Sequence, residues 1–189
     1  MKNVSTQSGF TLMEMIILMT IIGIIAAVAM PNAGSYIENN RMSAAVTEMT
    51  STLQLARSES VGRNVPVSIC AANANGTACN VFQGASNEWE IGWVVFLDPD
   101  ADGLLDSGEE VIRFQDQIRG EITMRGTGFL EWAITFFPSG RTNIGATELI
   151  MICDERGYGD DARAVVVSIL GRPSITKATD SGESSCDPS

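Results

Sequence analysis

The chain has 189 residues and a formal net charge of −11, from 12 basic and 23 acidic side chains. It contains no histidine, which removes the commonest general base and metal ligand and excludes Ser-His-Asp and Cys-His hydrolase sites. The length suits one soluble domain plus one extra helix, and the negative surplus disfavours binding to nucleic-acid phosphates and anionic lipid. No phosphate-binding P-loop pattern is present either, so the composition argues against an enzyme.

The N-terminal third contains a long apolar run. From Met15 to Met30 every residue is apolar or glycine except Thr20, and Pro31 closes the run. A helix over residues 10–31, rising ~1.5 Å per residue, would be about as long as the ~30 Å hydrocarbon core is thick. Glu14 lies inside this predicted helix, and a carboxylate at bilayer depth costs about 2.5–3.5 kcal/mol. The sequence therefore predicts a transmembrane helix whose carboxylate has a partner.

The segment ahead of this run, residues 1–9, is short and polar, with one positive charge at Lys2. In a secretory signal the apolar core precedes the cleavage site, whereas here the Gly9–Phe10 junction precedes the core. Cleavage at this junction would remove only the leader. It would create a new amine on Phe10, a few residues from Glu14.

The motif Gly9-Phe10-Thr11-Leu12-Met13-Glu14, followed by an apolar helix, resembles the class III signal of type IV pilins and type II secretion pseudopilins. This resemblance implies that a prepilin peptidase cuts after Gly9 and methylates Phe10. It also implies that Glu14 recruits the subunit and neutralises the amine of a neighbouring subunit. The chain would be held by a single pass in the bacterial inner membrane, with its domain in the periplasm. The alternative is a simple signal anchor with an accidental glutamate.

Residues 32–62 predict an amphipathic continuation of the same helix. Pro31 is tolerated with a kink, and the helix is expected to end near Gly62, a residue suited to a C-cap. The predicted rod is apolar on all sides in its first half and on one side in its second. Apolar residues recur mostly every three or four positions, which is the spacing of one helix face: Ile37, Met42, Ala45, Val46, Met49, Leu53 and Ala56.

Residues 63–178 change to strand-like patterns separated by turns. The expected fold class is α+β, a long N-terminal helix packed on a small antiparallel β-sheet domain that contains two small sheets. A polar tail, residues 179–189, follows. The expected strands cover residues 65–71, 91–97, 110–114, 121–125, 130–137, 148–153 and 164–170.

The four cysteines are Cys70, Cys79, Cys153 and Cys186. An even number without a C-x-x-C spacing indicates two disulfides in an oxidising compartment. Of the three possible pairings we favour Cys70–Cys79, which closes a short loop, and Cys153–Cys186, which pins the tail. The alternative is a zinc site formed by all four cysteines, but their spacing in the sequence does not fit the usual zinc-binding patterns.

The order of elements, and the phrases Gly92-Trp93-Val94-Val95-Phe96 and Gly171-Arg172, resemble the GspH/FimT/FimU branch of the pilin superfamily. This resemblance implies a non-catalytic minor pilin that primes or joins type IV pilus assembly. Its partners would be other major and minor pilins or pseudopilins. The alternatives are a minor pseudopilin of type II secretion and a DNA-receptor minor pilin in natural transformation.

The DNA-receptor alternative depends on a basic Gly-Arg-x-Arg stretch that the family carries near its C-terminus. Gly171 and Arg172 match this stretch, but Ser174 replaces the second arginine. Arg163, Arg172 and Lys177 would form a modest basic patch. The net charge makes DNA an unlikely partner, because affinity for DNA rests largely on phosphate neutralisation.

Residues 98–109 fit the twelve-residue calcium pattern D-x-D-x-D-G-x5-E. The flanking residues predict strands, so the loop would not belong to an EF-hand. No cofactor is required, and a bound Ca²⁺ would be structural. The other interpretation, a solvated Asp/Gly-rich connection, stays open. The candidate ligands are the carboxylates of Asp98, Asp100 and Asp102, the carbonyl of Leu104, Asp106 directly or through water, and a bidentate Glu109.

Overall fold

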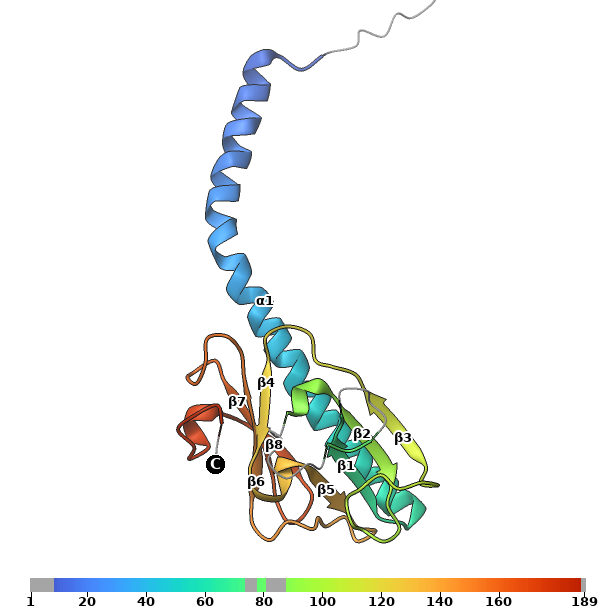
Figure 1. Ribbon diagram of the computed structural model, residues 1–189. Coiled ribbons are helices and arrows are strands. Elements are labelled where there is room, and N and C mark those ends of the chain that lie inside the picture. The colour runs from blue at the N-terminus through green and yellow to red at the C-terminus, as the bar shows by residue number, and fades with distance from the viewer. Residues whose placement is uncertain (1–8, 74–77, 81–87, 188–189) are drawn as a thin grey trace, which may run out of the picture. The chain divides into compact units, whose positions relative to one another are not determined.

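The computed structural model describes residues 9–73, 78–80 and 88–187. These residues form two units, which divide between Glu38 and Asn39. The first unit is helical, and the second contains the rest of the helix and all the strands (Figure 1).

The helix of the first unit is the beginning of α1, which runs over Leu12–Arg63. Its large apolar side chains between Leu12 and Ile25 are exposed, Leu12 at 78% and Met19 at 65%. Over the described part of the chain, no helix combines the length and the apolar character that crossing a membrane requires.

The second unit begins with the amphipathic part of α1. Six members of the predicted apolar stripe, from Met42 to Ala56, are buried, whereas Ile37 is exposed. The helix ends at Arg63. This end lies within one residue of the expected one near Gly62. The left-handed conformation that follows the helix is adopted by Asn64, whose φ is 57°, and not by Gly62. Asparagine tolerates this conformation.

Two four-stranded antiparallel sheets follow α1 in the second unit (Figure 1). The first has the strand order β3-β2-β1-β5 and the second the order β4-β6-β7-β8. This arrangement confirms the expected α+β class. The strand bounds are Val67–Ala71 for β1, Trp93–Leu97 for β2, Val111–Gln115 for β3, Thr123–Gly126 for β4, Ala133–Phe136 for β5, Glu148–Cys153 for β6, Arg163–Val167 for β7 and Pro173–Lys177 for β8.

The main core lies where the helix stripe meets both sheets. Trp93 of β2 is fully buried and donates its indole N–H to Thr52 Oγ1 of α1 at 3.1 Å. Trp89 is also fully buried and donates to the carbonyl of Leu130 at 2.8 Å. Because a buried indole N–H without a partner is costly, these bonds fix the two largest core side chains as well as satisfying them.

Two expected strands are shortened by 3₁₀ turns, and one strand of the structure was not expected. The strand expected over residues 91–97 begins later, because residues Trp89–Ile91 form a 3₁₀ turn, η1. The strand expected over residues 130–137 likewise follows a 3₁₀ turn, η2, at Gly128–Glu131. Strand β8 was not expected at all. Most of its side chains are exposed, so it shows no buried alternation, and its pairing with β7 recruits it into the sheet.

Two disulfides are present, Cys70–Cys79 and Cys153–Cys186. They are the pairings that the spacing favours. The second joins the end of β6 to the C-terminal segment, beyond the 3₁₀ turn η3 at Ala178–Asp180. Tyr158 holds the same segment, because its hydroxyl donates to the carbonyl of Glu183 at 2.6 Å.

Candidate functional sites

The Gly9–Phe10 junction, where the sequence predicts cleavage, lies outside the helix. Gly9 and Phe10 are exposed and precede α1. The helix starts after Thr11, whose hydroxyl accepts the backbone N–H of Glu14 at 3.3 Å. Thr11 is therefore the N-cap and Glu14 the third helical residue, the spacing of a capping box. A carboxylate in the first turn is also favoured by the partial positive charge at a helix N-terminus.

Asp98, the first residue of the acidic loop, is fully buried. One carboxylate oxygen, Oδ2, accepts the Ser68 hydroxyl at 2.5 Å and the Gly103 N–H at 2.9 Å. The other, Oδ1, accepts the Asp102 N–H at 3.3 Å. Ser68 Oγ lies 2.7 Å from Thr135 Oγ1, so one polar network connects the loop to β1 and β5. Asp98 thus anchors the loop to the sheet.

The structure brings together three of the six proposed calcium ligands. One carboxylate oxygen each of Asp98, Asp100 and Asp102 lies within 4.8 Å of the others, and the last two side chains are exposed. Glu109 instead accepts the backbone N–H of Asp106 at 2.8 Å. The loop also contains three residues with positive φ, among them Gly103 at 78°, which allows the sharp turn that such a loop needs.

Two carboxylates of the acidic loop have raised pKa values. A hydrogen bond with Asp98 raises the pKa of Asp100, and the charges of Asp102 and Asp98 add to the effect. Burial raises the pKa of Glu109, with further contributions from Asp98 and Asp100. Both shifts mean that the loop holds its full negative charge at a cost, which a bound cation would offset. The donor set, with hard oxygens only, suits Ca²⁺.

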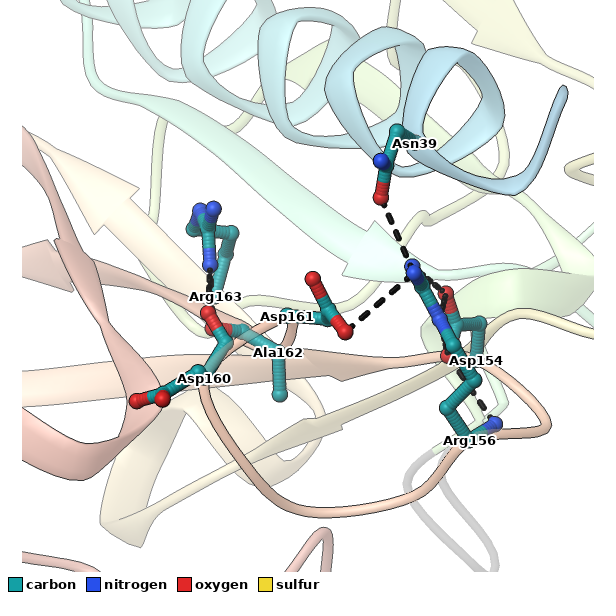
Figure 2. Close-up of polar contacts among 7 residues, drawn as sticks. All are labelled: Asn39, Asp154, Arg156, Asp160, Asp161, Ala162 and Arg163. Atoms are coloured by element: carbon teal, nitrogen blue, oxygen red, sulfur yellow. Dashed lines mark hydrogen bonds and ion pairs between the residues drawn. The ribbon is translucent and has the colours of Figure 1, made fainter. Parts of the chain in front are cut away.

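A second polar cluster connects α1 to the β6–β7 connection (Figure 2). The guanidinium of Arg156 pairs with Asp154 through Nη2 and Oδ2 at 2.5 Å, and with Asp161 at 3.2 Å. Its Nη1 also donates to Asn39 Oδ1 at 3.0 Å. The hydrogen bonds from Arg156 lower the pKa of Asp154. Arg156 therefore holds the connection against the first turn of α1 in the second unit.

The three cations of the expected basic patch are not gathered. Arg163 and Lys177 are cross-strand partners in β7 and β8, and the Arg163 guanidinium donates to the carbonyls of Asp160 and Ala162 (Figure 2). Arg172 lies just before the opposite end of β8, about 16 Å away at ~3.3 Å per residue. Arg172 instead lines a groove with Arg57 of α1.

The model of the family described as type II transport protein GspH matches residues 45–171. The chain belongs to the GspH family. The match covers the buried stripe of α1 from Ala45 onward and the strands as far as Gly171. It confirms the resemblance to the GspH/FimT/FimU branch. No curated protein matches the chain.

Two crystal structures of the type IV minor pilin FimU of Pseudomonas aeruginosa are similar to this GspH-family chain. The first is 24% identical with a TM-score of 0.59, and the match covers 80% of this chain and 98% of FimU. The second is 23% identical with a TM-score of 0.55 and covers 76% and 98%. At this identity the likeness shows a shared fold. The family and the similar structures are transport and pilin subunits, and none is described as an enzyme.

Three functional details escaped the sequence analysis. The N-cap role of Thr11 was readable, because Thr-x-x-Glu before an apolar run is the sequence signature of a capping box. The partners of Asp98 were not readable, because Ser68 lies 30 residues earlier and Thr135 lies 67 residues beyond Ser68. The contact of Arg156 with Asn39 spans 117 residues and likewise leaves no local signal.

Proposed function

We propose that this GspH-family chain is a minor type IV pilin that primes or joins pilus assembly as a non-catalytic filament subunit. The observation that carries the proposal is the Gly9-Phe10 junction directly ahead of a capped helix with exposed apolar side chains. That helix continues into the family's globular domain. An exposed apolar helix needs lipid or other helices to cover it, and a filament core supplies those helices.

In this proposal a prepilin peptidase removes residues 1–9 and methylates Phe10. Residues 10–31 wait in the inner membrane with the domain in the periplasm, and then move into the filament core. The Glu14 carboxylate neutralises the amine of a neighbouring subunit. Because a charge away from water is costly without a counter-charge, this pair would favour correctly placed subunits over misplaced ones.

The test replaces Glu14 with alanine and with glutamine. Both variants are expected to reach the membrane, and their recovery in sheared filaments is expected to fall about tenfold, a loss of about 1.4 kcal/mol of assembly free energy. Glu155→Gln, an exposed charge removed elsewhere, serves as the matched control. Normal incorporation of both Glu14 variants would refute the role of Glu14.

The alternative, a minor pseudopilin of type II secretion, uses the same helix and fold. The two systems differ in the subunits assembled beside this chain. Crosslinking in cells, followed by identification of the attached pilins, separates them: pilus subunits support the first assignment and secretion pseudopilins the second.

A DNA receptor is the weakest of the three alternatives. The chain has a net charge of −11, and binding of DNA depends on several cations placed along the phosphates. This alternative would be supported if the purified chain retained DNA, if added salt weakened this binding, and if Arg172→Ala abolished it.

We also propose that residues 98–109 hold a structural Ca²⁺, with Asp98, Asp100 and Asp102 as the central ligands. The support is the closeness of their carboxylate oxygens and the loop pattern. Ca²⁺ at 100 times its Kd would add about 2.7 kcal/mol to the free energy of unfolding, or about 5–10 °C in Tm. Equal Tm values in excess Ca²⁺ and in EGTA would eliminate this proposal, and Mg²⁺ serves as the control cation.

A further inference from the structure

A groove with two arginines lies between the C-terminal part of α1 and the start of β8. Its volume is about 700 Å³. We call it the arginine groove. Its lining residues are Gln54, Arg57, Ser58, Val61 and Gly62 of α1, together with Arg172 and Pro173.

The fold holds the Arg57 side chain and sets the backbone position of Arg172. Arg57 Nε donates to the carbonyl of Gly140 at 3.1 Å. That same carbonyl packs against Gly171, where a Cβ would come within 2.4 Å of the oxygen. Gly171 also has a φ of 67°, which favours glycine. The backbone therefore turns tightly at Gly171 and presents the next residue, Arg172, to the groove.

The two arginines have no carboxylate of their own. Arg63, Arg113, Arg125 and Arg156 all pair with acidic side chains. Among the described residues, neither Arg57 nor Arg172 forms an ion pair, and no acidic residue lines the groove. In a chain with 23 acidic and 12 basic residues, two neighbouring arginines without an acidic partner form a local positive site on a negative molecule.

We propose that the arginine groove binds an acidic segment of another filament subunit, an inference that rests on the proposed function. Guanidinium groups bind carboxylates in planar, two-pronged geometry. Gln54 and Ser58 supply further polar groups, and Val61 and Pro173 supply apolar surface for the side chains between the carboxylates. The groove is far larger than a water molecule, whose share of liquid volume is about 30 Å³, so it has room for several side chains. Two cations also neutralise too few phosphates for strong binding of DNA.

The experiment measures binding of an acidic peptide to the purified full chain in detergent, by fluorescence anisotropy. The probe is a fluorescein-labelled peptide with the sequence of residues 98–109, an available acidic protein segment. The control peptide carries Asn and Gln in place of Asp and Glu. The acidic peptide is expected to bind about tenfold more tightly than the control, and Arg172→Glu is expected to abolish this difference. Added NaCl should weaken the binding of the acidic peptide.

Arg119→Glu is the matched variant, because it makes the same charge change at an exposed arginine outside the groove. It is expected to change the affinity less than twofold. Arg172→Gln, which removes the charge without reversing it, should give most of the loss while the Tm of the chain stays unchanged. Equal binding of the two peptides, or equal losses in Arg172→Glu and Arg119→Glu, would overturn the proposal.

Two further arms identify the occupant. The proposal would be overturned in favour of nucleic acid if a twelve-nucleotide DNA strand bound more tightly than the acidic peptide and this binding were lost in Arg172→Glu. In cells, a photocrosslinker at Ser58 should attach to an acidic stretch of another pilin and fail to do so in Arg172→Glu. A crosslink to a segment without carboxylates would overturn the proposal. The peptide assay requires no filament, so its failure is distinguishable from an assembly defect in the Glu14 variants.

Discussion

Replacing Asp98 tests whether this buried carboxylate anchors the acidic loop. Asp98→Asn keeps the shape of the side chain but turns one acceptor into a donor. Whichever way the amide turns, its NH₂ group faces a backbone N–H, either that of Gly103 or that of Asp102. A buried donor left without an acceptor costs about 1–3 kcal/mol. For a folded unit of this size, a loss of about 2 kcal/mol lowers Tm by about 4–8 °C. Asp98→Ala, which removes all three hydrogen bonds, should cost about 4 kcal/mol.

The assay is thermal unfolding of the full chain at pH 7, followed by near-ultraviolet circular dichroism in EGTA, so that calcium plays no part. Asp100→Asn is the matched control from the same loop. It removes an exposed carboxylate whose pKa is raised by its hydrogen bond with Asp98. Its Tm should stay unchanged or rise.

Two results would contradict the anchor role. One is an Asp98→Asn variant that melts within 1 °C of the parent chain. Such a shift would correspond to a loss of less than about 1 kcal/mol. The other is an equal loss in Asp98→Asn and Asp100→Asn, which would mean that charge, and not the buried hydrogen bonds, stabilises the loop.

Three other predictions concern the stability of the second unit. Removing the Cys153–Cys186 disulfide, which spans 33 residues, should lower the free energy of unfolding by about 4 kcal/mol, and removing Cys70–Cys79, which spans 9, by about 3 kcal/mol. Urea unfolding of the two paired Cys→Ser variants checks this order. Equal losses would count against a loop-entropy origin. Asp100 and Glu109 have pKa values raised above their ordinary 3.8 and 4.5, so the folded state binds more protons than the unfolded state. The free energy of unfolding should therefore fall as pH rises from these ordinary values through the folded pKa values. The lowered pKa of Asp154 acts oppositely: its stabilisation is present above 3.8 and disappears as pH falls through the folded pKa. Urea titrations across pH 3–7 check both signs, and a rising slope above 4.5 that persists in Asp154→Asn would contradict the first. Arg156→Lys should lower Tm by several degrees, because lysine cannot contact Asp154, Asp161 and Asn39 together, whereas Asp160→Asn, in the same connection, should leave Tm unchanged.

Much of this molecule follows from short-range patterns. The spacing of Met42, Met49 and Leu53 predicts one helix face, and the structure buries that face. Strand β6 has the expected bounds, because Glu148–Cys153 is a β-forming run that is buried after its first residue. Strand β8 was missed because recognition by pattern needs a buried alternation, and an edge strand with exposed side chains does not have one.

The N-terminal motif needed no tertiary structure to be recognised. Residues Gly9 to Glu14 are adjacent in the chain, and the helix cap at Thr11 is also local, since a capping bond reaches only three residues. The order of residues along the chain is therefore enough to predict the cleavage junction and to place the start of the helix. The same is true of the loop pattern from Asp98 to Glu109, whose candidate oxygens are named by spacing alone.

Contacts between distant residues decided everything else. Only the folded chain shows that Asp98 accepts a hydrogen bond from Ser68 and that Arg156 donates one to Asn39. Likewise, only the fold shows that Arg172 lines a groove with Arg57 and not with Lys177. These pairs are 30 to 117 residues apart, so no periodicity or spacing rule connects them. Their closeness results from strand order and from the packing of α1 on two sheets, which are properties of the whole domain and not of any one segment.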